Sequence, residues 1–183
     1  MVIRKILFSI ILILTLSSAK VNALPDPCII PKDLQKELEI KYVDYETVNI
    51  NHLDEDDRTY FSKSHGLKCP GAVKVNFFGE NKETYALLLK LKEINSRPYG
   101  TPKHVLIITL NKNEKNWELI KIDDLKSLDT PVIWSEPKGK YEDVYGKKKI
   151  QAKFSAILLA YYESSAILYY WTDKDVDKIW LSD

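Results

Sequence analysis

The stretch His104-Val105-Leu106-Ile107-Ile108-Thr109-Leu110 carries the strongest strand signal in the chain, because β-branched and aliphatic residues fill it almost without interruption. A polar turn follows from Asn111 to Asn116, and the alternating segment from Trp117 to Ile122 comes directly after it. Two strand-forming segments joined by a short polar turn are typical of a hairpin. We therefore predict a β-hairpin here and build the fold outward from it.

The segments on both sides of this hairpin also predict strands. Ala72 to Phe78 and Thr84 to Leu91 precede it and are separated by a turn at Gly79 to Lys82. Three more strands follow near the C-terminus: Ser155 to Tyr162, Ala166 to Trp171 and Val176 to Leu181. The connections between these three are too short to hold a helix, so we expect them to run antiparallel.

Short helices are predicted before the strands. Lys32 to Glu39 has helical propensity, follows Pro31, and places Leu34 and Leu38 four residues apart. Asp54 to Ser64 begins with four consecutive acidic residues, which suit the positive end of a helix dipole. Both helical patterns lie in the first third of the chain.

The remaining segments have weaker patterns. Tyr42 to Ile50 alternates loosely and suits a strand, Asp123 to Lys138 contains two prolines and is predicted to be irregular, and no strand is assigned to Gly139 to Lys149. No long helical pattern alternates with the strands, which argues against a doubly wound α/β fold. We therefore predict an α+β fold, in which short N-terminal helices precede a mostly antiparallel, twisted or partly closed β-sheet of about seven strands.

The first 23 residues have the three parts of a secretory signal peptide: Arg4 and Lys5, an apolar run from Ile6 to Leu16, and small and polar residues ending at Ala23. The apolar run is shorter than the roughly 20 residues that a membrane span requires. We predict cleavage after Ala23, with a retained N-terminal anchor as the alternative. Residues 24–183 would then form a single periplasmic or secreted domain without a membrane contact.

The charge balance of the mature chain is close to neutral. Residues 1–23 contain three basic and no acidic residues, so the mature chain has 24 Lys and Arg against 26 Asp and Glu, a formal charge of −2. A protein that binds DNA or RNA normally carries a basic patch or stripe. We therefore predict no nucleic-acid partner.

Cys28 and Cys69 are the only two cysteines of the chain. In an exported protein an even cysteine count favours a disulfide, which here would close a loop of about 42 residues and stabilise the fold by ~4 kcal/mol in the chain-entropy model. Two buried free thiols are the alternative.

One segment allows a family comparison. Residues 77–88, FFGENKETYALL, place a glycine-and-acid turn before an apolar strand. This segment resembles a degenerate integrin-type FG-GAP unit, and Tyr169–Trp171 followed by Ile179–Asp183 is similar to the ending of many small uncharacterised exported bacterial proteins that carry such a turn. Members of the FG-GAP group bind calcium through several aspartates in the turn. This turn offers only Glu80, Asn81 and Glu83, so we do not carry the metal over.

The sequence contains no recognisable catalytic or metal-binding constellation. The three histidines are far apart and lack metal-ligand spacing, and there is no G-x-S-x-G motif. A thiol hydrolase built on His65 and Cys69 is disfavoured because Pro70 and Gly71 break a helix there, and because a disulfide would remove the thiolate. We predict no metal and no cofactor.

Aromatic and acidic residues provide the candidate binding surfaces. We expect a long loop from Pro131 to Tyr145 to present Trp134, Tyr141 and Tyr145 among charged residues. The acidic residues Asp54, Asp56 and Asp57 supply a second candidate contact, with a solvated helix start as the alternative. Neighbouring aromatics such as Tyr161-Tyr162 and Tyr169-Tyr170 are expected to face opposite sides of a sheet, where they either pair across strands or bind a protein.

These observations favour a non-enzymatic exported protein that binds another protein, of the inhibitor or immunity type, against a cell-wall-directed enzyme. The alternative is a small secreted hydrolase that acts on carbohydrate or cell-wall material through paired carboxylates, whose separation a sequence does not determine. A structural envelope component is a third hypothesis.

Overall fold

The computed structural model describes residues 27–79, 83–92, 102–113, 116–162 and 164–182. The signal peptide predicted for residues 1–23 lies outside the described residues. So does most of the turn predicted at Gly79 to Lys82.

Two helices, a short 3-10 helix and eleven strands make up the described chain. In order they are α1 (Lys32–Lys41), β1 (Tyr45–Thr47), η1 (Ile50–His52), α2 (Glu55–His65), β2 (Ala72–Lys74), β3 (Thr84–Leu91), β4 (His104–Asn113), β5 (Asn116–Leu125), β6 (Val132–Glu136), β7 (Gly139–Glu142), β8 (Lys149–Ala152), β9 (Ala156–Tyr161), β10 (Ser165–Trp171) and β11 (Val176–Ser182).

The strands form three antiparallel sheets. Sheet A has the order β1-β3-β4-β5, with β2 also paired to β3, and sheet B has the order β11-β10-β9-β6. Strands β7 and β8 form a separate hairpin. The predicted hairpin is confirmed as β4–β5, and the predicted C-terminal meander is confirmed as β9–β10–β11.

Sheets A and B pack face to face. Their shared core contains Ala86, Leu88, Leu106 and Ile108 from sheet A, and Ile133, Ile157, Leu159, Ile167 and Tyr169 from sheet B. Side chains alternate along a strand, so each central strand also carries a second apolar row on its outer face. Residues 86–89 and 105–108 are therefore buried without interruption.

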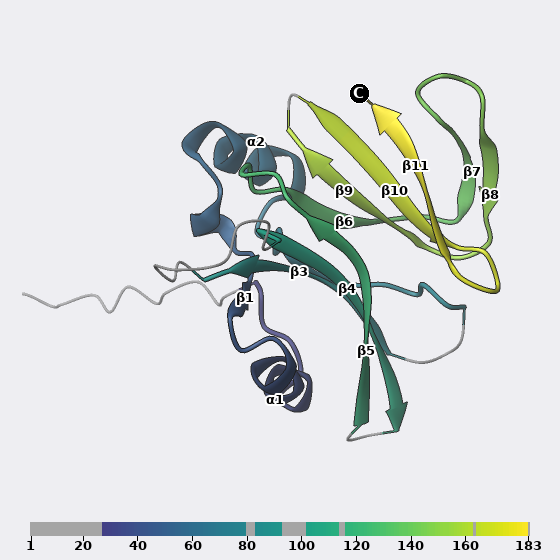
Figure 1. The fold of residues 1–183 in the computed structure, drawn as a ribbon. Coiled ribbons are helices and arrows are strands. Elements are labelled where there is room, and N and C mark those ends of the chain that lie inside the picture. Colours follow the sequence, from purple (N-terminus) through teal and green to yellow (C-terminus); the bar gives the residue numbers. More distant parts are fainter. Residues whose placement is uncertain (1–26, 80–82, 93–101, 114–115, 163, 183) are drawn as a thin grey trace, which may run out of the picture.

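Separate elements cover the two outer faces. Leu34 and Leu38 of α1 pack on Leu87 and Ile107 of sheet A. On sheet B, Phe61 of α2 and the β7–β8 hairpin pack on an outer row that includes Leu158 and Leu168. Figure 1 shows this arrangement, with α1 beneath sheet A and with α2 and β7–β8 next to different parts of sheet B.

The prediction of an α+β fold with one sheet of about seven strands is wrong. Of the described residues, 48% lie in strands and 17% in helices, so the fold is mostly β. The two predicted helices are present, but they are short covers on a two-sheet core. The central strands of both sheets are buried on two faces, which a sequence pattern for one half-exposed sheet does not reveal.

Three of the strands fall in segments that the sequence did not mark as strands. β6 lies within the stretch predicted to be irregular, β7 lies within Gly139 to Lys149, and β8 begins at Lys149 and continues to Ala152. The apolar run Val132-Ile133-Trp134 is too short to show a period and is bounded by two prolines. It becomes a strand because β9 offers a free edge, on which Ile133 pairs with Leu159.

Cys28 and Cys69 form a disulfide, as predicted, with their Cα atoms 4.8 Å apart. The bond joins the segment before α1 to the segment between α2 and β2. No helix among the described residues has the length and apolarity needed to cross a membrane.

His104 makes the free energy of unfolding depend on pH. It is 1% exposed and lies on the face of β4 that carries Leu106, and neither ring nitrogen has a hydrogen-bond partner among the described residues. Burial, reinforced by Lys90, His52 and Lys103, lowers the pKa of His104 to about 4.

The unfolded chain therefore binds a proton at this histidine near pH 6.5, whereas the folded chain resists protonation down to about pH 4. The contribution of neutral His104 to the free energy of unfolding is fully present above pH 6.5. It is lost as the pH falls toward 4, and the total loss is on the order of 3 kcal/mol. Urea unfolding at pH 7 and pH 4.5 measures this loss. In His104→Leu the free energy of unfolding should change less with pH than in the unmodified protein. If it changes with pH equally in both proteins, His104 is not the group responsible.

Candidate functional site

The sequence-predicted binding residues lie in two separate regions on the outside of sheet B. Trp134 belongs to β6, Asp54, Asp56 and Asp57 lie at the start of α2, and Tyr141 and Tyr145 belong to the β7–β8 hairpin. The long loop predicted from Pro131 to Tyr145 is therefore wrong, because Trp134 and Tyr141 both lie in strands.

The acidic residues at the start of α2 are fixed by helix capping. Asp54 caps the helix, and its Oδ1 accepts a hydrogen bond of 2.8 Å from the backbone N–H of Asp57. Asp54, Glu55 and Asp56 are exposed and Asp57 is half-buried. The guanidinium of Arg58 donates to the carbonyl oxygens of Ile50 and Leu53, so it points back toward η1.

Trp134 lies against the C-terminal end of α2. Its ring centroid is 4.6 Å from that of His65, which in turn lies 4.8 Å from Phe61. The indole Nε1 of Trp134 donates a hydrogen bond of 2.6 Å to Glu136. Burial in this stack lowers the pKa of His65, which favours the neutral ring at neutral pH.

A groove of about 470 Å³ lies on the outer face of sheet B beside α2. The side chains that line it are mostly aromatic, small or hydroxyl-bearing, and they include Tyr60, His65, Trp134, Ala160, Tyr162 and Ala166. Tyr60 is 58% exposed and its ring lies 4.7 Å from that of Tyr162, edge to face. We call this feature the α2 groove.

The hydroxyl group of Tyr162 is buried in the α2 groove without a hydrogen-bond partner among the described residues. Burial raises the pKa of Tyr162 to about 12, and the nearby charges of Tyr60 and Asp57 add to that shift. Of the sequence-predicted residues, Trp134 therefore lines the α2 groove, whereas Asp54, Asp56 and Asp57 do not line it. The three aspartates lie at the start of the helix that carries Tyr60.

Tyr141 and Tyr145 lie apart from the α2 groove. The hydroxyl of Tyr141 donates to the carbonyl of Pro137 at 2.6 Å, and its ring packs on the outer core of sheet B. Tyr145 is 61% exposed in the turn between β7 and β8, with the ammonium of Lys147 5.5 Å from its ring centre. Neither tyrosine lines the α2 groove.

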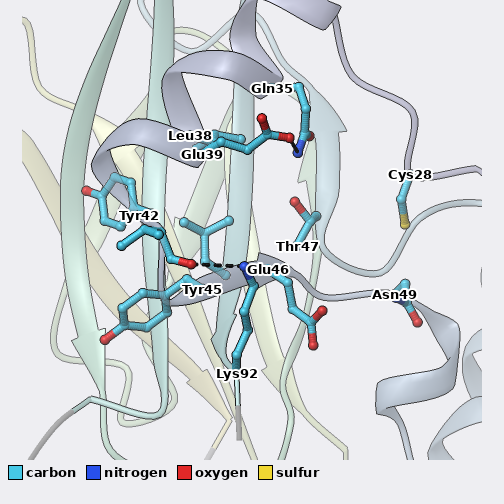
Figure 2. A pocket seen from close by; sticks show the side chains of 12 residues that line it. Cys28, Gln35, Leu38, Glu39, Tyr42, Tyr45, Glu46, Thr47, Asn49 and Lys92 are labelled. Carbon is cyan, nitrogen blue, oxygen red and sulfur yellow. Dashed lines mark hydrogen bonds between the residues drawn. The ribbon is translucent and has the colours of Figure 1, made fainter. Parts of the chain in front are cut away.

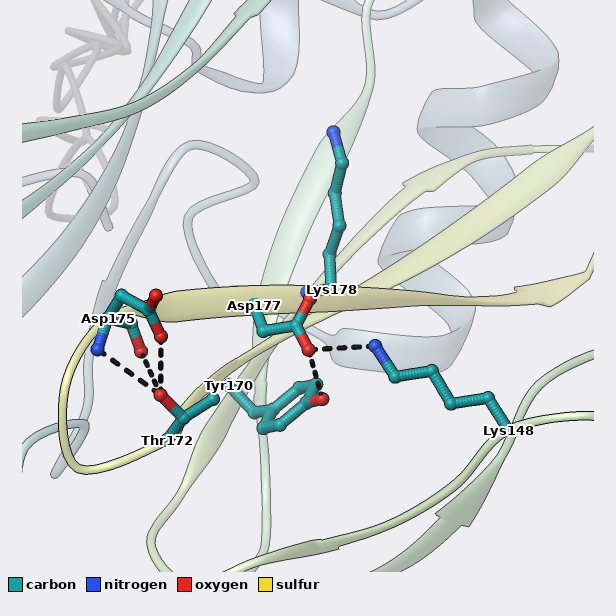
Figure 3. A network of polar contacts seen from close by, with 6 residues as sticks. All are labelled: Lys148, Tyr170, Thr172, Asp175, Asp177 and Lys178. Atoms are coloured by element: carbon teal, nitrogen blue, oxygen red, sulfur yellow. Dashed lines mark hydrogen bonds and ion pairs between the residues drawn. The ribbon is translucent and has the colours of Figure 1, made fainter.

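A network of polar contacts fixes the hairpin to sheet B. Figure 3 shows Asp177 of β11 between Tyr170 and Lys148, and its Oδ2 accepts from the Tyr170 hydroxyl at 2.6 Å and from the Lys148 ammonium at 2.7 Å. Although partial burial opposes it, these two donors hold the pKa of Asp177 below its ordinary value. The backbone N–H of Val144 also donates to the carbonyl of Trp180 at 2.8 Å. The hairpin is thus attached by both charge and backbone contacts.

A second hollow, of about 480 Å³, lies between α1 and β1 (Figure 2). Several of its polar groups have partners within the chain. Gln35 donates to Glu39 at 3.0 Å, Lys92 donates to the carbonyl of Val43 at 2.9 Å, and Glu46 contacts His52 at 3.2 Å. Because these polar groups are already paired within the chain, we interpret the hollow as a structural feature and not as a binding site.

The carboxyl groups of Asp33 and Asp123 have shifted pKa values, and both accept hydrogen bonds within the protein. A hydrogen bond from the Trp117 indole lowers the pKa of Asp33. Asp123 also has a lowered pKa because donors from Lys178 and Tyr169 outweigh its partial burial. A catalytic acid requires the opposite shift. Among the described residues, no three histidine, cysteine or acidic side chains are grouped so that they could hold a metal ion.

Comparison with protein-family models, curated proteins and solved structures finds no match to this chain. The resemblance to FG-GAP-like exported proteins therefore stays a prediction.

Sequence reasoning missed several residues of the groove. Nothing in the sequence marked His65, Ala160 or Ala166 as a residue of a binding groove. Tyr162 did have a signal, because neighbouring aromatics were expected to face opposite sides of a sheet. The structure confirms this alternation: Tyr161 packs on the core between the sheets, and Tyr162 packs on the outer face of sheet B.

Proposed function

We propose that this protein is exported and acts by binding another protein through the outer face of sheet B next to α2. In the concrete form of the proposal, it is an inhibitor or immunity-type protein that occludes a cell-wall-directed enzyme in the periplasm or outside the cell. The observation that carries the proposal is the α2 groove, which is lined by the exposed ring of Tyr60 and the half-buried ring of Trp134 and lies beside a helix with an acidic first turn.

The composition of this face supports a binding role. Tyrosine and tryptophan are enriched in interface hot spots, because they bury a large area at a low entropic cost. Tyr60 and Trp134 are held by packing against Tyr162 and His65, so little of their freedom remains to be lost on binding. The disulfide is compatible with an oxidising compartment, which supports export.

Affinity capture followed by an activity assay tests the proposal. Immobilised residues 24–183 should retain a cell-wall-directed enzyme from an envelope extract or from the spent medium of competing cells. Adding the free protein should slow the release of soluble fragments from purified peptidoglycan by that enzyme at least tenfold.

Charge reversal on the proposed face provides the matched control. Asp56→Lys should reduce capture and inhibition at least fivefold, because it changes the exposed acidic start of α2. Glu39→Lys makes the same charge change on α1, which covers the other sheet, and should leave both unchanged. Equal effects of the two variants would contradict the proposed face. Fragment release by the protein alone would favour the hydrolase alternative and overturn the proposal.

A further inference from the structure

The floor of the α2 groove is a row of small side chains that crosses sheet B. Ala160 of β9 pairs with Ala166 of β10, and Ala166 pairs with Ser182 of β11. All three line the groove. Side chains on paired residues point to the same face of a sheet, so this row forms a trough across three strands.

Larger side chains border the trough on both sides along β9. Leu158, two residues before Ala160, pairs with Trp134 of β6 and with Leu168 of β10. Tyr162, two residues after Ala160, lies against Tyr60 of α2. An aromatic ring therefore stands on each side of the small row, and the floor between the two rings consists of two alanines and a serine.

The charge next to the trough further restricts what fits it. The ring of Tyr162 lies 4.7 Å from that of Tyr60, and Tyr60 follows the acidic first turn of α2 in the same helix. An occupant should therefore combine an apolar side chain with a positive charge.

We propose that the trough seats a large aromatic side chain of the partner protein, with a lysine or arginine next to it that faces the acidic start of α2. This inference rests on the proposed binding function and specifies the chemistry of the partner. The aromatic side chain packs on Ala160 and Ala166 between the rings of Trp134 and Tyr162. Edge-to-face contacts with such rings add to the area that the side chain buries.

A glycan is the less suitable occupant. Sugar recognition needs several polar groups directed at ring hydroxyls, and the α2 groove offers serine hydroxyls around an apolar floor. The indole N–H of Trp134 is also already bonded to Glu136.

Methyl NMR titration with short blocked peptides tests the inference directly. Acetyl-Lys-Trp-Lys-amide should shift the methyl signals of Ala160 and Ala166. Acetyl-Glu-Trp-Glu-amide and acetyl-Lys-Ser-Lys-amide should bind at least tenfold more weakly, because the first reverses the charge and the second lacks the ring. Equal shifts with all three peptides, or no shift with the first, would overturn the inference.

Matched variants localise the effect. Ala166→Phe fills the trough and should abolish the shift of the Ala160 methyl, while Val144→Phe adds the same side chain to the exposed hairpin turn and should leave it unchanged. Asp56→Lys should weaken peptide binding at least fivefold, and Glu39→Lys should not. A titration with chitotetraose that shifts the same methyl groups, while the peptide does not, would replace the protein partner by a glycan. If the protein still captures and inhibits an enzyme, and Asp56→Lys weakens that capture while the peptide does not bind, the inference fails and the proposed function stands.

Discussion

Removing the disulfide with Cys28→Ser and Cys69→Ser should lower the free energy of unfolding by about 4 kcal/mol. The two cysteines are 41 residues apart, and the bond limits the conformations of the unfolded chain over that whole length. In the folded protein it joins the segment before α1 to the segment between α2 and β2. The expected loss is a large fraction of the stability of an ordinary domain.

Urea unfolding with and without a reductant measures this effect. A loss of about 4 kcal/mol corresponds to a decrease of roughly 2 M in the urea midpoint for a protein of this size. The double serine variant is its own control, because reductant should not change its midpoint further. If reductant leaves the midpoint of the unmodified protein unchanged, the bond contributes nothing and the expectation is wrong.

Gly71→Ala should destabilise the fold by about 3 kcal/mol, since it overpacks a site where two segments converge. The N–H of Leu88 donates to the carbonyl of Gly71, and the carbonyl of Leu88 accepts from the N–H of Val48. The segment that contains Gly71 and the segment that contains Val48 therefore both hydrogen-bond to Leu88 of β3. A Cβ atom at Gly71 would lie 2.3 Å from the carbonyl oxygen of Val48 and 2.7 Å from its Cβ, so the backbone must move.

Gly139→Ala is the matched control for this prediction. A Cβ atom at Gly139 would have its nearest neighbour at 3.7 Å, on the ring of Tyr141, which is an ordinary contact distance. We expect its urea midpoint to stay close to that of the unmodified protein. Circular dichroism shows whether Gly71→Ala folds at all. Similar midpoints for the two variants would show that the contact with Val48 does not limit packing.

Local patterns in the sequence were sufficient for the elements that form from neighbouring residues. The two helices begin and end close to the expected residues, because Pro31 and Asp54 mark their starts. The β4–β5 hairpin and the β9–β10–β11 meander also follow from short turns between apolar segments. Residues close in sequence pair in each of these elements, so their signals are visible in the sequence.

The candidate site could be predicted only in part. Trp134 and the acidic residues Asp54, Asp56 and Asp57 were selected for their chemistry, and the structure places Trp134 in the α2 groove and the acidic residues at the start of the helix beside it. The floor of the groove was not predictable, since Ala160, Ala166 and Ser182 form a row only through strand register. A shift of one residue in that register would turn these side chains to the other face.

The sequence by itself determined the cysteine pair, the helices, the main hairpins and the alternation of adjacent aromatics, because each depends on residues near one another or on a choice between few partners. Only the tertiary structure decided that the strands divide into two sheets, that β6 joins the edge of β9, and that α2 and the hairpin share one outer face. These outcomes depend on which distant surfaces bury one another. That competition involves the whole chain, and no local pattern records its result.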